Sequence, residues 1–115
     1  MYIKTWQTWL FITYLSLIIF VTLQPGDKLF LNSIWKYDKI IHFIEYLILG
    51  FLLINALKIK PIKKIHWYYS FLFLIIFPII DESLQYFTPS RVPDIYDAFA
   101  DIIGGTVGAL IRKYI

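Results

Sequence analysis

Ionisable and polar side chains recur at helical spacing in a chain that is otherwise strongly apolar. They are His42, Glu45, Tyr46, Glu82, Gln85, Asp97 and Asp101. Glu45 and Tyr46 follow His42 by three and four residues, Gln85 follows Glu82 by three, and Asp101 follows Asp97 by four, so each group would occupy one face of a helix. Imidazole, carboxylate and amide groups could bind a polar head group, hold a divalent cation or relay protons. The chain has no cysteine, which excludes thiolate chemistry, disulfides and cysteine-bound metals.

The composition indicates the environment that must hold these groups. Of the 115 residues, 59% are hydrophobic and 20% are aromatic, whereas a soluble domain is about 45–50% apolar. Such a chain lacks the polar residues that would cover a water-facing surface. We therefore expect an integral membrane protein, in which the net charge of +3 reflects topology rather than affinity for nucleic acid.

Four apolar runs predict four membrane-spanning helices. The runs cover residues 6–23, 40–57, 65–80 and 95–111, and each is near the roughly 20 residues that a hydrocarbon core requires. In lipid the backbone has no partner but itself, so each run should be α-helical. The first run follows Lys4 as a signal peptide would, but it has no small-x-small cleavage site before Pro25, and we expect it to remain as a span. No linker, repeat or low-complexity tract divides residues 1–115, so we predict one all-α domain with the helices in a single bundle.

The basic residues predict the orientation of this bundle. Seven fall at one end, namely Lys4, Lys58, Lys60, Lys63, Lys64, Arg112 and Lys113. Four fall at the other end, namely Lys28, Lys36, Lys39 and Arg91. Because cytoplasmic loops carry an excess of Lys and Arg, we predict that both termini are cytoplasmic. All eight acids lie at the opposite, outer end, which favours an outward-facing polar site there.

Two of these acids are predicted to lie well inside the membrane boundary. At 1.5 Å of rise per residue, Glu45 and Asp101 are each about 10 Å along their helices from the outer end. An ionisable group at such depth is a candidate functional residue. Simpler roles are open to the outermost acids: Asp38 and Asp94 could be helix N-caps, and Asp81 could be a solvated residue at the end of the third span.

The last predicted helix carries a stripe of acids followed by glycines. Asp97, Asp101, Gly104 and Gly108 are separated by four, three and four residues, so they share one face. The lower half of the stripe is a Gly-x-x-x-Gly pattern, which allows another helix backbone to approach closely. We therefore predict that Gly104 and Gly108 pack against a neighbouring helix, while the carboxylates point into the bundle.

The second half of the chain resembles the signature of the VanZ-like family of small bacterial membrane proteins. The signature reads Glu-x-x-Gln, an aromatic-Pro-Gly-Arg loop and Asp-x-x-x-Asn-x-x-Gly-x-x-x-Gly. Its matches here are Glu82, Gln85, Phe87, Pro89, Arg91, Asp97, Gly104 and Gly108. An upstream segment of the family is matched by Asp38, Lys39, His42, Phe43 and Tyr46. The resemblance covers residues 38–110, with Ser90 in place of the loop Gly and Asp101 in place of the Asn.

The resemblance implies a cell-envelope protein, and the founding member of the family is associated with low-level teicoplanin resistance. Together with the polar residues, it favours a protein of the bacterial plasma membrane that binds or modifies a lipid or a cell-wall-linked group. In this interpretation the planar guanidinium group of Arg91 would bind a phosphate or carboxylate through two parallel hydrogen bonds. Membrane lipids or a lipid-linked cell-wall intermediate are the expected partners, and neither a cofactor nor nucleic acid is expected.

The alternative is a metal-dependent membrane enzyme that acts on a lipid phosphate or head group. Its divalent cation would be held by His42, Glu45, Glu82 and Asp97 and would activate water. The sequence has no compact metal motif and no obvious nucleophile, so we expect a binding role before a catalytic one. Two further roles, structural glue within the bundle and coupled transport, rank lower, and the sequence leaves the ligand and the oligomeric state open.

Overall fold

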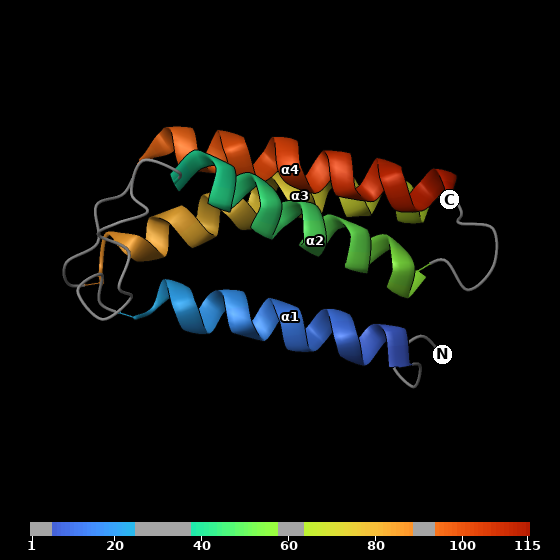
Figure 1. Cartoon of the computed structure of the whole chain (residues 1–115), viewed down its shortest axis with the longest axis horizontal. Coiled ribbons are helices and arrows are strands. Elements are labelled where there is room, and N and C mark those ends of the chain that lie inside the picture. The colour runs from blue at the N-terminus through green and yellow to red at the C-terminus, as the bar shows by residue number, and fades with distance from the viewer. Residues whose placement is uncertain (1–5, 25–37, 58–63, 89–93) are drawn as a thin grey trace.

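The computed structural model of the chain describes residues 6–24, 38–57, 64–88 and 94–115, and these form four α-helices (Figure 1). They are α1 (Trp6–Thr22), α2 (Asp38–Leu57), α3 (Lys64–Gln85) and α4 (Ile95–Tyr114). Consecutive helices run in opposite directions, so α1 begins and α4 ends at the same end of the bundle, on the right in Figure 1. The prediction of an all-helical chain with four helices is confirmed for the described residues. The orientation of the termini relative to a membrane stays a prediction.

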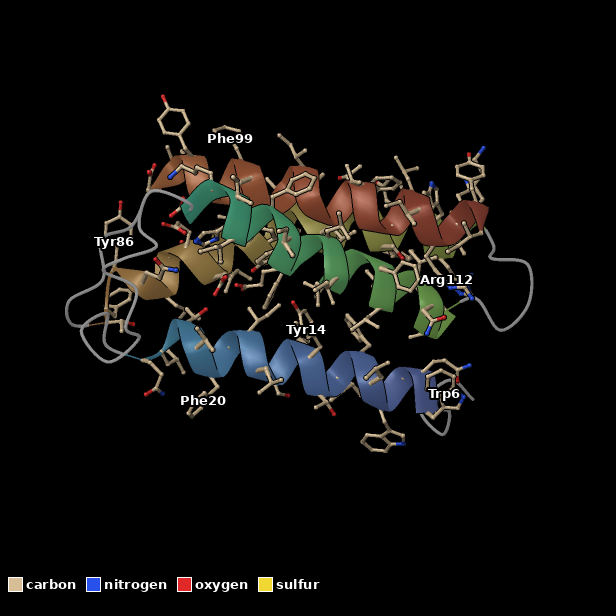
Figure 2. All side chains as sticks on the ribbon, viewed as in Figure 1. Trp6, Tyr14, Phe20, Tyr86, Phe99 and Arg112 are labelled. Atoms are coloured by element: carbon tan, nitrogen blue, oxygen red, sulfur yellow. The ribbon has the colours of Figure 1, made fainter. Side chains whose placement is uncertain are left out.

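The surface of the bundle is largely apolar. Among the described residues, two helical stretches are long and apolar enough to cross a membrane, Lys39–Leu57 and Lys64–Gln85, and α1 is a shorter apolar helix. Figure 2 shows Phe20 on α1 and Phe99 on α4 pointing away from the bundle, and these side chains are 61% and 53% exposed. A surface of this kind suits contact with lipid rather than with water.

Helices α2 and α4 pack so closely that their backbones touch. A Cβ atom added at Gly104 would lie 2.2 Å from the carbonyl oxygen of Phe43, and one at Gly108 would lie 1.9 Å from that of Leu47. A Cβ atom added at Gly50, on α2, would likewise lie 2.0 Å from the carbonyl oxygen of Gly105 on α4. Only the absence of side chains at these positions permits this approach. The contact fixes which residues of α2 face the N-terminal half of α4.

Helix α3 continues beyond the end of its apolar run. The third span is predicted to end at residue 80, but the helix runs to Gln85 with Pro78 inside it. The physical reason is burial: Asp81, Glu82 and Gln85 are only 3%, 7% and 4% exposed, because they pack against neighbouring helices. The polar residues after the apolar run therefore belong to the helix and not to a solvated connection.

Helix α1 lies along α2 and, less extensively, along α3. Tyr14 points from α1 toward α2 (Figure 2), and its hydroxyl donates to the backbone carbonyl of Glu45 at 2.8 Å. The rings of Phe11 and Phe73 meet edge to face with their centroids 6.1 Å apart. These contacts hold α1 against α2 and α3, whereas the most extensive packing in the bundle is between α2 and α4.

Candidate functional site

Polar side chains from every described helix meet at the end of the bundle where α1 and α3 finish and α2 and α4 begin. This polar cluster comprises Thr22, Lys39, His42, Glu45, Tyr46, Asp81, Glu82, Gln85, Asp94, Asp97 and Asp101. Most of these side chains are buried, and Tyr46 and Asp101 are 0% exposed. Burying so many polar groups is costly unless they are paired. Their pairing therefore reveals how the site is built.

Asp81 joins three helices. The hydroxyl of Thr22, on α1, donates to its Oδ1 atom, and the hydroxyl of Tyr46, on α2, donates to its Oδ2 atom at 2.7 Å. Both carboxylate oxygens thus have a donor. The interpretation of Asp81 as a solvated residue at the end of a span is wrong, because α3 continues past it and buries it against α1 and α2.

The donors of α2 meet the acids of α4. His42 lies between two carboxylates: its Nδ1 atom is 2.8 Å from Oδ1 of Asp101, and its Nε2 atom is 3.5 Å from Oδ2 of Asp97. One turn earlier, Lys39 Nζ lies 2.5 Å from Asp97 and 2.7 Å from Asp94. The glycine contact between α2 and α4 makes these distances attainable. The Lys39 ammonium group and the His42 imidazole on α2 are therefore matched by carboxylates of α4.

Asp94 caps α4 and also links it to α3. Its side chain accepts a hydrogen bond from the backbone N–H of Tyr96 at 2.9 Å, as an N-cap does. The hydrogen bond from Lys39 lowers the pKa of this carboxyl from its ordinary value of 3.8. The backbone N–H of Asp94 donates to Oε1 of Glu82. The end of α3 is thus tied to the start of α4.

Two buried carboxylate oxygens have no hydrogen-bond partner among the described residues. They are Oε2 of Glu82 and Oδ2 of Asp101. A buried polar atom without a partner costs about 1–3 kcal/mol, and more when it is charged. A donor placed at either atom would therefore bind with a gain in free energy.

A groove of about 160 Å³ lies beside the cluster, between α1 and α2. Its walls are Tyr14, Leu17, Ile18 and Val21 on α1 and Glu45 on α2. The α1 wall is almost entirely apolar, whereas the α2 wall contributes an acid. This combination suits a molecule with an apolar and a polar part.

The site residues predicted from sequence fall into four groups. His42, Tyr46, Glu82, Asp97 and Asp101 are brought together in the hydrogen-bonded cluster. Gln85 is buried one turn beyond Glu82, and Glu45 lines the groove. Arg91 lies outside the described residues. Gly104 and Gly108 lie at the α2 contact.

Four members of the cluster are not among the site residues predicted from sequence: Thr22, Lys39, Asp81 and Asp94. Lys39 is three residues before His42, so helical spacing places it on the same face and could have identified it. The N-cap role of Asp94 was predicted and is confirmed, but its contact with Lys39 was not predicted. Nothing in the sequence around Thr22 signals a partner on α3.

The metal-binding alternative has no matching arrangement in the part of the chain that the structure describes. There, no three side chains of His, Asp or Glu are placed so as to hold one metal ion. Both ring nitrogens of His42 face carboxylate oxygens, so the imidazole as positioned directs neither nitrogen elsewhere. A cation held by His42, Glu45, Glu82 and Asp97 stays a prediction from sequence.

Comparison with known proteins identifies a family for the whole chain. A sequence model of the family described as VanZ/LLP1 matches residues 2–115. Comparison with curated proteins and with solved structures finds no match. The family match extends the resemblance seen over residues 38–110 to nearly every residue.

Proposed function

This chain belongs to the VanZ/LLP1 family, and from that premise we propose that it is a multi-pass protein of the bacterial plasma membrane that binds or modifies a lipid or cell-wall-linked group. The polar cluster is the proposed site. In this proposal the cluster faces outward and both termini are cytoplasmic, because by sequence seven of the eleven basic residues belong to the predicted cytoplasmic end. Membrane lipids or a lipid-linked cell-wall intermediate are the partners in this proposal.

The observation that carries the proposal is the burial of acids inside an apolar helical bundle. Asp81, Glu82, Asp97 and Asp101 are each at most 7% exposed. Ionisable groups within membrane helices are costly, and they mark functional sites by default. A network that served only as structural glue would pair its buried atoms. Oε2 of Glu82 and Oδ2 of Asp101 have no partner in the part of the chain that the structure describes, and this supports a role in binding.

A link to teicoplanin resistance is the finer part of the proposal. It rests on the VanZ-like resemblance, and the site is consistent with it, because a head-group site at the outer surface is where lipid-linked cell-wall intermediates are exposed. Binding such an intermediate, or modifying it, would change the form of the intermediate that is accessible to the antibiotic. Catalysis is not required for this effect.

Conservative changes at the site test the proposal. Both Glu82→Gln and Arg91→Lys keep much of the size and polarity of the side chain. Glu82→Gln removes the negative charge, and Arg91→Lys removes the planar guanidinium group that can form two parallel hydrogen bonds. Lys113→Arg, a conservative change at the opposite end, is the control. Each variant is first shown to be folded and inserted, and the teicoplanin sensitivity of cells that express it is then measured. We expect cells that express either site variant to differ from the parent in teicoplanin sensitivity, and cells that express Lys113→Arg to match the parent. If both site variants show the teicoplanin sensitivity of the parent, Glu82 and Arg91 have at most a structural role and the proposed site is wrong.

A further inference from the structure

We infer that the polar cluster takes a membrane lipid whose head group carries an ammonium group, with an acyl chain of that lipid in the groove between α1 and α2. The inference rests on the proposed function and specifies its ligand class. Charge, hydrogen bonding and the position of the groove each support it.

The charge of the cluster is negative. Among the described residues its carboxylates number six: Glu45, Asp81, Glu82, Asp94, Asp97 and Asp101. Its cationic groups are Lys39 and, when protonated, His42, and both are directed at acids of α4. Adding Arg91, which lies outside the described residues, would bring the cations only to three. An anionic head group would meet a surplus of like charge, whereas an ammonium group would offset it.

The hydrogen-bonding capacity of the cluster points the same way. Five of its side chains carry N–H or O–H donors besides any protonated acid, and four of these are already directed at carboxylates: Thr22, Lys39, His42 and Tyr46. The fifth is the buried Gln85 amide, which is also an acceptor. The buried atoms without partners among the described residues are both acceptors, Oε2 of Glu82 and Oδ2 of Asp101. An ammonium group offers three N–H donors and no acceptor, and a phosphate offers only acceptors. The cluster therefore needs the donors that an ammonium group supplies.

The groove leads toward the cluster. At one end Tyr14 donates to the Glu45 carbonyl, and at the other end Val21 precedes Thr22, whose hydroxyl donates to Asp81. Leu17, between these ends, is 55% exposed. An acyl chain lying against Leu17 and Val21 would bury apolar surface and bring its head group to the outer end, beside the acids.

Competition among lipids tests the inference with the full chain in detergent micelles. Phosphatidylethanolamine, phosphatidylcholine and phosphatidylglycerol with identical acyl chains are supplied in equal amounts, and bound lipid is measured by native mass spectrometry. The first has an ammonium group with N–H donors, the second has the same charge without donors, and the third is anionic. We expect phosphatidylethanolamine to be retained about tenfold over phosphatidylglycerol, a ratio that corresponds to about 1.4 kcal/mol, and also above phosphatidylcholine. Retention of either competitor at an equal or higher level overturns the inference.

Variants assign the retention to this site. Asp101→Asn keeps the shape of the side chain and restores the residue of the VanZ-like signature, so it should fold, as circular dichroism will verify. We expect it to reduce the preference for phosphatidylethanolamine about tenfold, in line with the same relation. Leu17→Trp should fill the groove and lower retention. Ile79→Trp, a control on α3 with similar exposure (53% against 55%), should not.

The outcomes separate the two claims. If another lipid is retained best and Asp101→Asn abolishes its retention, a head-group site exists and the ammonium inference is wrong. If Leu17→Trp and Ile79→Trp behave alike, the groove does not hold the acyl chain and that part of the inference is wrong. If no lipid responds to Asp101→Asn or Leu17→Trp, both the inference and the proposed site fail.

Discussion

Replacing Gly108 with alanine should destabilise the bundle, whereas the same change at Gly105 on the same helix should not. The added Cβ at Gly108 would lie 1.9 Å from the carbonyl oxygen of Leu47 and 2.7 Å from its carbonyl carbon. Both are backbone atoms of α2, so no side-chain rotation relieves the overlap. An ordinary Cβ contact begins near 3.4 Å, and α4 would therefore have to move away from α2 by about 1.5 Å.

The magnitude follows from what that movement disturbs. Forcing an extra carbon into a packed interface costs about 1–3 kcal/mol. The same movement would stretch the 2.8 Å contact between His42 and Asp101, and a hydrogen bond to a charged group is worth about 1.5–3 kcal/mol. Alanine returns about 1 kcal/mol through its higher helix propensity. We therefore expect a net loss of about 1.5–5 kcal/mol from these contributions.

The assay is unfolding in mixed micelles, followed by far-UV circular dichroism as the fraction of denaturing detergent is raised. Gly105→Ala is the matched control, because the nearest atoms to its added Cβ are side-chain atoms of Leu74, the closest being the terminal Cδ2 at 3.1 Å. Its free energy of unfolding should equal or slightly exceed that of the parent. Equal free energies of unfolding for Gly108→Ala and Gly105→Ala would refute the close α2–α4 contact.

Two further predictions concern individual hydrogen bonds of the cluster. Tyr46→Phe removes the donor at 2.7 Å from the buried Asp81 and should cost about 1–3 kcal/mol in the same unfolding assay; parental stability would contradict the described role of Asp81. Asp94→Asn should keep the N-cap but lose the charge pairing with Lys39, so a small loss of stability is expected at neutral pH. Because the pKa of Asp94 is lowered from 3.8, its stabilising effect is present above that value and is lost as the pH falls through the lowered pKa. The difference between parent and variant should therefore vanish in acid, and a difference that persisted or grew there would contradict the assignment.

The positions of the helices can be read from the sequence because each apolar run is long, and in lipid such a run can only be a helix. Helices α1, α2 and α4 begin and end within a few residues of their predicted spans. The end of α3 could not be predicted in this way. Hydropathy marks where apolar residues stop, but the helix continues to Gln85 because its polar side chains are buried by neighbouring helices.

The candidate site can be predicted within a helix but not between helices. The helical period fixes which residues share a face, and it correctly pairs Glu82 with Gln85, both buried. One partner of Asp81 is Thr22, 59 residues away, and that contact depends on how α1 is rotated and shifted along α3. The glycine stripe shows which face of α4 meets a neighbour, but only the structure shows that the neighbour is α2.

The central claim is that the polar cluster faces the outside of the cell, and thiol labelling tests it most directly. The chain has no cysteine, so Lys60→Cys and Ser90→Cys each introduce a single reactive group, one at each predicted end of the bundle. Intact cells that express either variant are treated with a membrane-impermeant thiol reagent, and the same treatment after permeabilisation shows that both positions can react. We expect labelling at position 90 in intact cells, and at position 60 only after permeabilisation. Labelling of intact cells at position 60 and not at position 90 would place the cluster on the cytoplasmic side and contradict the account.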